Sequence, residues 1–467
     1  MNGTVPRPSR RQMLAAGAVG VAGVAGAGAG IFLLPRHTST SNPLSAAGPD
    51  GAWASTLGTA RGLAAHLLRR AGFGYSDAEL DAAASMRYSD LVEKVIAQQP
   101  EDLPAIANPA DYRQVIVAWQ SHMASATAQY PDRVAFFWHG VLTSDFRNAV
   151  QQPVVLQQLK TFRSLGRSDL RSLLLAITYD PLMIRYLDLQ QSSAAAPNEN
   201  YARELMELFT LGPGNYTETD VREGARIFSG IRAILVDATG APARLPSLQG
   251  LTVQQQLAQV QQLIAQGYSY KGVMQPRLHD QGEKTYLKQS GNLAPEQAID
   301  ILLSQPACAA HVATRALVHF ATPNPSKSLV DSVATKFRAS KYDMTALMRA
   351  IFTSSDFTAA ANYRSLVRSP VDYTVAAMRA LGRPELTAQA ALAGAGMAQV
   401  LYDPPNVGGW PNNAGWIASS TWLARLNFAA QATSHPLALP DPRTAQKYQL
   451  DGVVGADTAA QYKAATT

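Results

Sequence analysis

Two glutamates one helical turn apart are the first residues whose spacing could support chemistry. Glu204 and Glu207 follow Glu199 and Arg203 in one charged segment. On a helix, residues three or four positions apart share a face, so the two carboxylates could bind a metal or act as an acid/base pair facing a cleft. The i, i+4 spacing of Glu199, Arg203 and Glu207 equally fits a ladder of salt bridges on a solvated surface. The spacing alone leaves both interpretations open.

A histidine and an aspartate are adjacent at His279 and Asp280, ahead of Gly282 and Lys284. Such a pair can bind a metal or serve as a base with its orienting carboxylate. The alternative is an Asx-type turn, in which Asp280 caps the backbone and Gly282 supplies a positive φ. The candidate catalytic residues are therefore Glu204, Glu207, His279, Asp280 and Lys284.

His139 ends an aromatic segment that begins at Phe136. A lone histidine among aromatic residues is typical of a packed core residue that is hydrogen-bonded to the backbone. It could instead contribute to a site for a divalent or transition metal between helices, as carboxylates and imidazoles do in helical bundles. The ligand set for such a site would be His139, Glu204, Glu207, His279 and Asp280. A zincin is excluded, because no His-x-x-x-His or His-Glu-x-x-His spacing occurs.

Helices must position these residues, because apolar side chains recur at helical spacing from Leu63 onward and alternating strand-like runs are scarce. The pattern predicts one all-α, multi-helix globular domain over residues 48–434, with at most a small hairpin or loop insertion around 231–250. The proline-rich and then Ala/Thr-rich residues 435–467 are expected to form a loosely structured tail. The helices are predicted over residues 131–142, 169–178, 199–211, 217–230, 253–266, 295–303, 307–320, 328–338, 345–353, 370–381 and 416–430.

The helix predicted over 199–211 has the clearest pattern. Asn198 is a natural N-cap, and Gly212 is a natural stop. Its apolar side would carry Tyr201, Ala202, Leu205, Met206, Leu208 and Phe209, and its opposite side Glu199, Arg203, Glu204 and Glu207. Further capping signals start helices at Thr217 and Ser369.

The N-terminus has the pattern of a twin-arginine export leader. Arg10 and Arg11 precede a weakly apolar stretch that runs to Leu34. Small residues allow cleavage after Ala47, so residues 1–47 are predicted to be a signal peptide and the mature chain to be periplasmic or extracellular. The alternative is a permanent N-terminal anchor, since the stretch is long enough to span a bilayer. No segment of the mature chain is apolar enough to be a transmembrane domain.

Charge and cysteine content exclude other classes. The net charge of +6 includes four arginines in residues 1–47, which hold no acid. Removal of the leader would therefore leave only about +2, without the basic stripe that nucleic-acid binding requires. The single cysteine, Cys308, excludes an intrachain disulfide and a thiolate zinc site.

A rigid segment at 404–411 contains two prolines at its start and two glycines, with Trp410 near its end and Trp416 beyond it. The tryptophans could form a platform for a sugar or another flat ligand, or they could simply anchor the loop on a helical core. Neither a phosphate-binding loop nor a dinucleotide fingerprint occurs in the chain.

Several motifs follow one another in order along most of the chain: His66-Leu-Leu-Arg-Arg-Ala-Gly-Phe-Gly74, Phe137-Trp-His-Gly140, Asn198 to Gly212, His279-Asp-Gln-Gly-Glu-Lys284, Arg368-Ser-Pro-Val371 and Pro404-Pro-Asn-Val-Gly-Gly-Trp-Pro411. In this combination the chain closely resembles the bacterial family named domain of unknown function 1800 (DUF1800), over about residues 61–430. Members of that family often carry twin-arginine leaders and are often encoded beside a second exported protein that resembles sulfatases and alkaline phosphatases. The resemblance implies a co-exported protein partner and assigns no activity.

Two functions are consistent with these patterns. The first is an accessory or binding module that acts in the cell envelope with the co-exported partner, because no complete catalytic constellation is present. The alternative is a metal-dependent hydrolase or oxidoreductase with a His/Glu/Asp site between helices, since export in the folded state suits a protein that takes up its cofactor beforehand. The sequence leaves open whether the chain is an enzyme.

Overall fold

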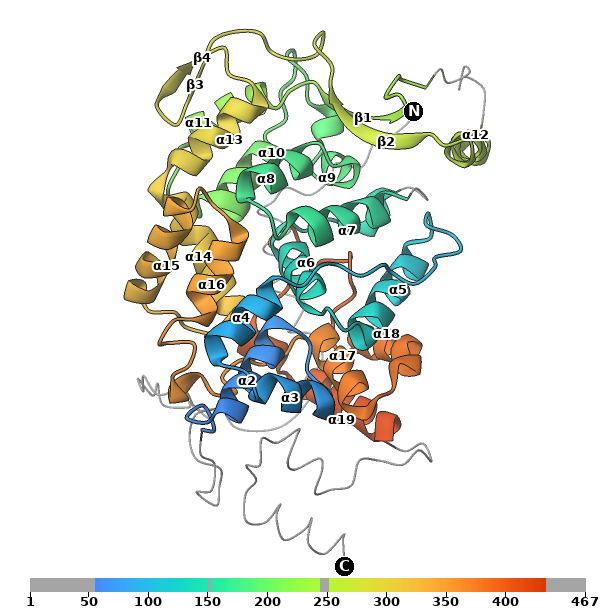
Figure 1. Cartoon of the computed structure of the whole chain (residues 1–467). Helices are drawn as coiled ribbons and strands as arrows, with labels where there is room; N and C mark the ends of the chain where they lie inside the picture. The colour runs from blue at the N-terminus through green and yellow to red at the C-terminus, as the bar shows by residue number, and fades with distance from the viewer. Residues whose placement is uncertain (1–54, 150–152, 244–251, 434–467) are drawn as a thin grey trace, which may run out of the picture. The chain divides into compact units, whose positions relative to one another are not determined.

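The computed structural model describes residues 55–149, 153–243 and 252–433. Over these residues the chain is a mostly helical globular domain with two small two-stranded sheets (Figure 1). The predicted fold class is therefore confirmed. The leader, with Arg10 and Arg11, and the tail from 435 onward lie outside the described residues. None of the described helices combines the length and the apolar character needed to cross a membrane.

The α-helices of the first half are short and closely spaced. They are α2 (Ala60–Ala71), α3 (Asp77–Ala84), α4 (Tyr88–Ile96), α5 (Tyr112–Ser125), α6 (Tyr130–Val141), α7 (Val154–Leu165), α8 (Leu170–Thr178), α9 (Pro181–Tyr186), α10 (Asn200–Glu204) and α11 (Glu218–Ile227). The 3₁₀ helices η1 (Phe146–Ala149) and η2 (Leu189–Gln191) connect some of them.

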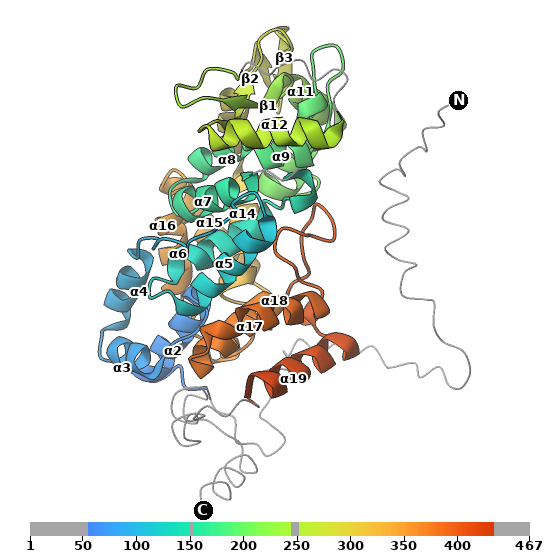
Figure 2. The same ribbon diagram turned by 90° about the vertical axis from the view of Figure 1, so that its right-hand side faces the viewer.

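The second half continues this pattern. Its α-helices are α12 (Val253–Ala265), α13 (Pro295–Ser304), α14 (Pro306–Phe320), α15 (Lys327–Ala339), α16 (Met344–Phe352), α17 (Pro370–Leu381), α18 (Thr387–Gly396) and α19 (Ser419–Thr433). Short 3₁₀ helices lie between them: η4 (Ala360–Asn362), η5 (Pro384–Leu386) and η6 (Asn413–Trp416). Helices α17, α18 and α19 pack together (Figure 2).

Local capping explains where two of the predicted helices begin. The Thr217 side chain accepts a hydrogen bond from the backbone N–H of Asp220, whose carboxylate accepts from Thr217 N–H, so the capping box at the start of α11 is confirmed. The Ser369 side chain caps α17 by accepting a hydrogen bond from Asp372 N–H, and Gly382 ends that helix in the left-handed conformation with a φ of 63°.

The helix predicted over 199–211 differs from expectation in its second half. It begins as α10 and continues as the π-helix η3 (Leu205–Thr210), in which the N–H groups of Leu211 and Gly212 both donate to Met206 O, at 2.8 and 3.1 Å. The segment packs against α11 on one side and against α13 and α14 on others. Glu204, which was predicted on a polar face, is only 6% exposed.

A small sheet forms where an insertion was expected, although its second strand lies farther along the chain. Strand β1 (Ile231–Val236) pairs antiparallel with β2 (Ser269–Met274), and α12 lies between them in sequence. A second hairpin joins β3 (Lys284–Tyr286) to β4 (Gln289–Gly291) and was not predicted.

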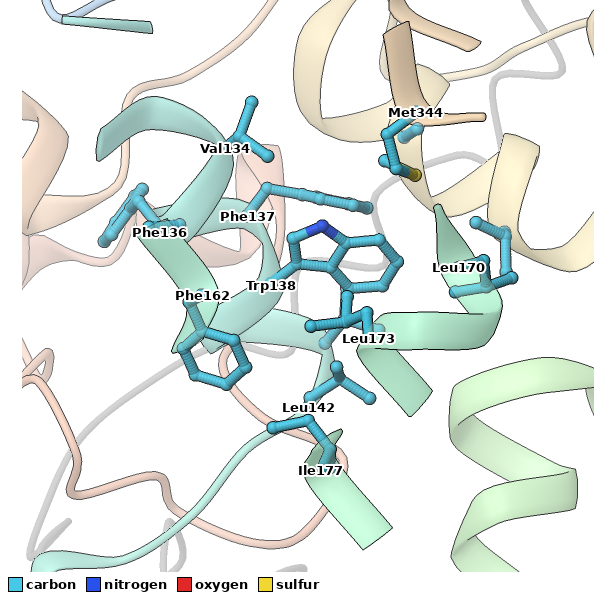
Figure 3. Close-up of a cluster of buried hydrophobic side chains, with 14 of the residues drawn as sticks. Val134, Phe136, Phe137, Trp138, Leu142, Phe162, Leu170, Leu173, Ile177 and Met344 are labelled. Carbon is cyan, nitrogen blue, oxygen red and sulfur yellow. The ribbon is translucent and has the colours of Figure 1, made fainter. Parts of the chain in front are cut away.

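Helix α6 lies within the buried core. Figure 3 shows Trp138 of α6 surrounded by apolar side chains from α8 and by Met344 at the start of α16. Its indole N–H donates to Gly166 O at 2.8 Å, so the polar atom of this buried ring is satisfied. Because this packing fixes α6, it also fixes the position of Arg133 and His139 on the same helix.

Candidate functional site

A cavity of about 560 Å³ is lined by residues of α2, α6, α14 and α17, by the segment before α17 and by the segment between α18 and α19. Its lining carries an unusual excess of positive charge. One carboxylate, that of Asp372, faces six arginines: Arg69, Arg70, Arg133, Arg315, Arg364 and Arg368. Aromatic rings, including Tyr373 and Trp416, complete the wall.

The single carboxylate is shared by two of the arginines. Asp372 of α17 is 5% exposed, and its Oδ2 lies 3.1 Å from Nη1 of Arg133, itself 4% exposed. Its Oδ1 accepts a hydrogen bond of 2.6 Å from Arg368. Burial alone would raise the pKa of Asp372, but Arg133 and Arg368 hold it below the ordinary value. Asp372 is therefore ionised at neutral pH and compensates one positive charge.

Arg70 of α2 has no such partner. It is 8% exposed, donates a long hydrogen bond of 3.5 Å to Asn362 O, and forms no ion pair with a carboxylate of the described residues. Burial, with smaller contributions from Arg69, Arg368 and Arg133, lowers the pKa of Arg70 to about 9. Asp372 acts on Arg70 only as the smallest of these contributions, in the opposite direction. A buried cation without a directly paired carboxylate is costly, so this position favours an anion.

Arg315 of α14 is in a similar position. Its Nη2 donates to the carbonyl oxygen of Gly140 at 3.2 Å, and no described carboxylate pairs with it. Burial lowers its pKa. Two guanidinium groups of the lining, those of Arg70 and Arg315, thus have charge and donors available for a negatively charged ligand.

Another part of the lining joins two distant sequence motifs. Nε2 of His139 accepts a hydrogen bond of 2.9 Å from the backbone N–H of Tyr402, and Trp410 stacks on the imidazole at 4.9 Å between centroids. Thr143 Oγ1 donates to Val407 O at 2.7 Å. These contacts attach the 404–411 segment to the end of α6. The predicted anchoring role of this loop is therefore present in the structure, beside the cavity.

Four of the ordered motifs meet at this cavity. They contribute Arg69 and Arg70, His139 and Gly140, Arg368 and Ser369, and Trp410 and Pro411 to its lining. Sequence reasoning missed the site because each arginine, taken alone, resembles a surface charge on an amphipathic helix. The sequence did hold one signal for the site: Arg69 and Arg70 lie in one of the ordered motifs, and Arg368 lies in another.

A family model described as "Protein of unknown function (DUF1800)" matches residues 66–467. The chain belongs to the DUF1800 family. The match begins at the first residue of the opening motif and continues past residue 430, where the resemblance was expected to end. No curated protein and no solved structure matches the chain.

In this DUF1800 protein, His139 is a packed core residue, which is one of the two roles considered for it from the sequence. Its ring lies among Trp119, Tyr402 and Trp410, and its Nε2 is occupied by the Tyr402 N–H. Burial lowers the pKa of His139 to about 3. The imidazole is therefore neutral at physiological pH and forms part of the cavity wall.

Glu204 and Glu207 are held apart from the cavity on α10 and η3. The Glu207 carboxylate accepts a hydrogen bond of 2.7 Å from the hydroxyl of Tyr216. Arg203 pairs with Glu199 at 3.0 Å and with Glu218 of α11 at 2.7 Å. The predicted salt-bridge ladder is thus present in part, with Glu218 as the second partner of Arg203.

His279 and Asp280 lie in a structural turn, and Lys284 follows it as the first residue of β3. Asp280 accepts a hydrogen bond of 2.8 Å from Gly282 N–H, as in the predicted Asx turn, and pairs with Arg226 at 2.7 Å. The hydrogen bond from Arg226 lowers the pKa of Asp280. Gly282 does not have a positive φ; instead, a Cβ there would lie 2.9 Å from an Arg226 nitrogen.

The side chains of His279 and Lys284 are also engaged in the fold. His279 Nδ1 lies 3.0 Å from Ser229 O. The buried ammonium of Lys284 donates to Gly282 O at 2.9 Å and to Asn292 Oδ1 at 3.1 Å, and burial lowers its pKa. Among the residues that the structure describes, no group of three or more His, Cys, Asp or Glu side chains could hold a metal. The set His139, Glu204, Glu207, His279 and Asp280 is therefore not assembled into one metal site.

Proposed function

We propose that this DUF1800 protein is a binding module that holds an anionic ligand in the arginine-lined cavity. The observation that carries the proposal is the position of Arg70 and Arg315, two guanidinium groups in the lining without an ion pair to a described carboxylate. Guanidinium groups present paired N–H donors that match carboxylate, sulfate and phosphate oxygens. An anion in the cavity would supply the missing counter-charge.

The dimensions of the cavity support a small-molecule ligand. Its volume of about 560 Å³ lies within the range of ordinary ligand sites in proteins. Rings such as Tyr373 and Trp416 add apolar surface to the charged lining. A ligand that combines one anionic group with an organic body fits both features.

The proposal includes action outside the cytoplasm. The leader motif with Arg10 and Arg11 supports twin-arginine export to the periplasm or beyond, and the family resemblance supports work with a co-exported protein partner. Replacement of both Arg10 and Arg11 by lysine should retain the chain in the cytoplasm of a host with a twin-arginine system. Unchanged export of that variant would contradict this part of the proposal.

The binding proposal is tested by thermal unfolding of the purified mature chain with phosphate, sulfate, acetate or a neutral sugar. Anions should raise the Tm of the wild type, because a ligand that binds the folded state stabilises it. Arg70→Met should abolish that increase. Arg171→Met is the matched control, since Arg171 pairs with Asp300 on the surface and is not in the cavity lining. Equal increases in all three proteins, or none in the wild type, would overturn the proposal.

A further inference from the structure

We propose that the cavity selects a doubly charged phosphate monoester, with its phosphate held by the cluster of Arg70, Arg133 and Arg368 and its organic group against the aromatic wall. This inference rests on the proposed function and names the chemical class of the ligand.

The charge of the cluster is the first argument. Asp372 pairs with Arg133 and Arg368. Arg70 and Arg315, in the same lining, form no ion pair with a described carboxylate. A carboxylate or a sulfate monoester would compensate one of these two charges, whereas a phosphate monoester carries close to −2 above pH 7 and compensates both.

The location of the cluster at the ends of several elements is the second argument. Arg70 lies in the last turn of α2, Arg133 near the start of α6, and Arg368 just before α17. Guanidinium groups from three separate elements can approach a tetrahedral group from different sides, which suits its oxygens better than a flat carboxylate. Arg315 adds a fourth donor group from α14.

The volume of the cavity is the third argument. A space of about 560 Å³ is much larger than one tetrahedral oxyanion. Tyr373 and Trp416 provide surfaces on which a ring can pack. The site therefore favours an ester, in which the phosphate is attached to an organic group, over free inorganic phosphate.

The test is isothermal titration of the mature chain at pH 8 with four probes: phenyl phosphate, phenyl sulfate, benzoate and inorganic phosphate. The first three share a ring and differ in charge. We expect phenyl phosphate to bind at least about tenfold more tightly than phenyl sulfate or benzoate, and more tightly than inorganic phosphate. In Arg70→Met, which lowers the cluster charge by one, the preference for phenyl phosphate over phenyl sulfate should shrink several-fold.

The outcomes separate this inference from the proposed function. If phenyl sulfate or benzoate binds as tightly as phenyl phosphate, the cavity binds anions and the choice of a dianion is overturned. If inorganic phosphate binds as tightly as phenyl phosphate, the ester is overturned. If none of the four binds, both the inference and the proposed function fail.

Discussion

The backbone N–H of Tyr402 donates a hydrogen bond of 2.9 Å to Nε2 of His139, across 263 positions of sequence. This bond requires an imidazole whose Nε2 carries a lone pair. Burial lowers the pKa of His139 to about 3, so that the acceptor is present over the whole physiological range. One neutral histidine thereby attaches the 404–411 loop to α6 and shapes a wall of the arginine-lined cavity.

Replacement of His139 by phenylalanine should keep an aromatic ring and remove the acceptor. The buried Tyr402 N–H would then lack a partner, which costs about 1–3 kcal/mol. Urea denaturation at pH 7 should show a loss of that size in the free energy of unfolding. An unchanged free energy of unfolding would mean that the His139 hydrogen bond does not hold the loop.

Gly409 should tolerate no side chain. Its φ is +85°, and a Cβ there would lie 2.8 Å from Gly140 O. Gly409→Ala should therefore lower the free energy of unfolding by at least about 1–2 kcal/mol and weaken anion binding, because the loop would move away from α6. Gly396→Ala is the control: its Cβ would meet nothing within 4 Å, so its effect on both readouts should be small.

Asp180 should make stability depend on pH. Burial raises its pKa to about 7, above the ordinary 3.8, even though its carboxylate accepts hydrogen bonds from Met183 N–H at 2.8 Å and from Gln158 at 2.7 Å. A carboxyl whose folded pKa is raised is favourable to folding at low pH and becomes unfavourable as pH rises. The contribution of Asp180 should thus be lost as pH rises from about 4 to about 7.

Asp180→Asn retains an oxygen acceptor and cannot ionise. Its free energy of unfolding should change less than that of the wild type between pH 4 and pH 7, as measured by denaturant titration at each pH. Parallel pH profiles for the two proteins would show that Asp180 has an ordinary pKa in the folded chain.

Asp372→Asn should be strongly destabilising without an anion and partly rescued by one. The substitution leaves Arg133 and Arg368 without their carboxylate, and breaking a buried ion pair in this way costs about 3–5 kcal/mol. Added phosphate should then raise the Tm of the variant by more than it raises the Tm of the wild type. A smaller increase in the variant would contradict the view that Asp372 and the ligand compensate the same charges.

Short-range signals allowed much of the fold to be predicted. The capping residues Thr217 and Ser369 and the terminal Gly382 act within one helical turn, so their sequence patterns correctly locate the starts of α11 and α17 and the end of α17. The end of α11 lies at Ile227, before the predicted Gly230. Strand β2 was missed because its pairing with β1 depends on residues far apart in the chain. The burial of Glu204 was missed because it depends on tertiary packing, which the spacing of residues along one helix does not show.

The candidate site was predictable only in its parts. Arg70, Arg133 and Arg368 lie on different elements, and no spacing rule shows that they share one cavity with Asp372. His139 was selected from the sequence and does line the cavity, with a structural role in its wall. The carboxylates chosen for their spacing, Glu204 and Glu207, lie elsewhere, since charged pairs one turn apart are common on helix surfaces.

The position of a bound dianion tests the central claim most directly. Crystals of the mature chain soaked in selenate, which is tetrahedral and doubly charged, would locate the anion by its anomalous signal. The account predicts a selenium peak inside the cavity, with selenate oxygens within about 3 Å of guanidinium nitrogens of Arg70 and its neighbours. Peaks confined to the outer surface, with the cavity empty of selenate, would contradict it.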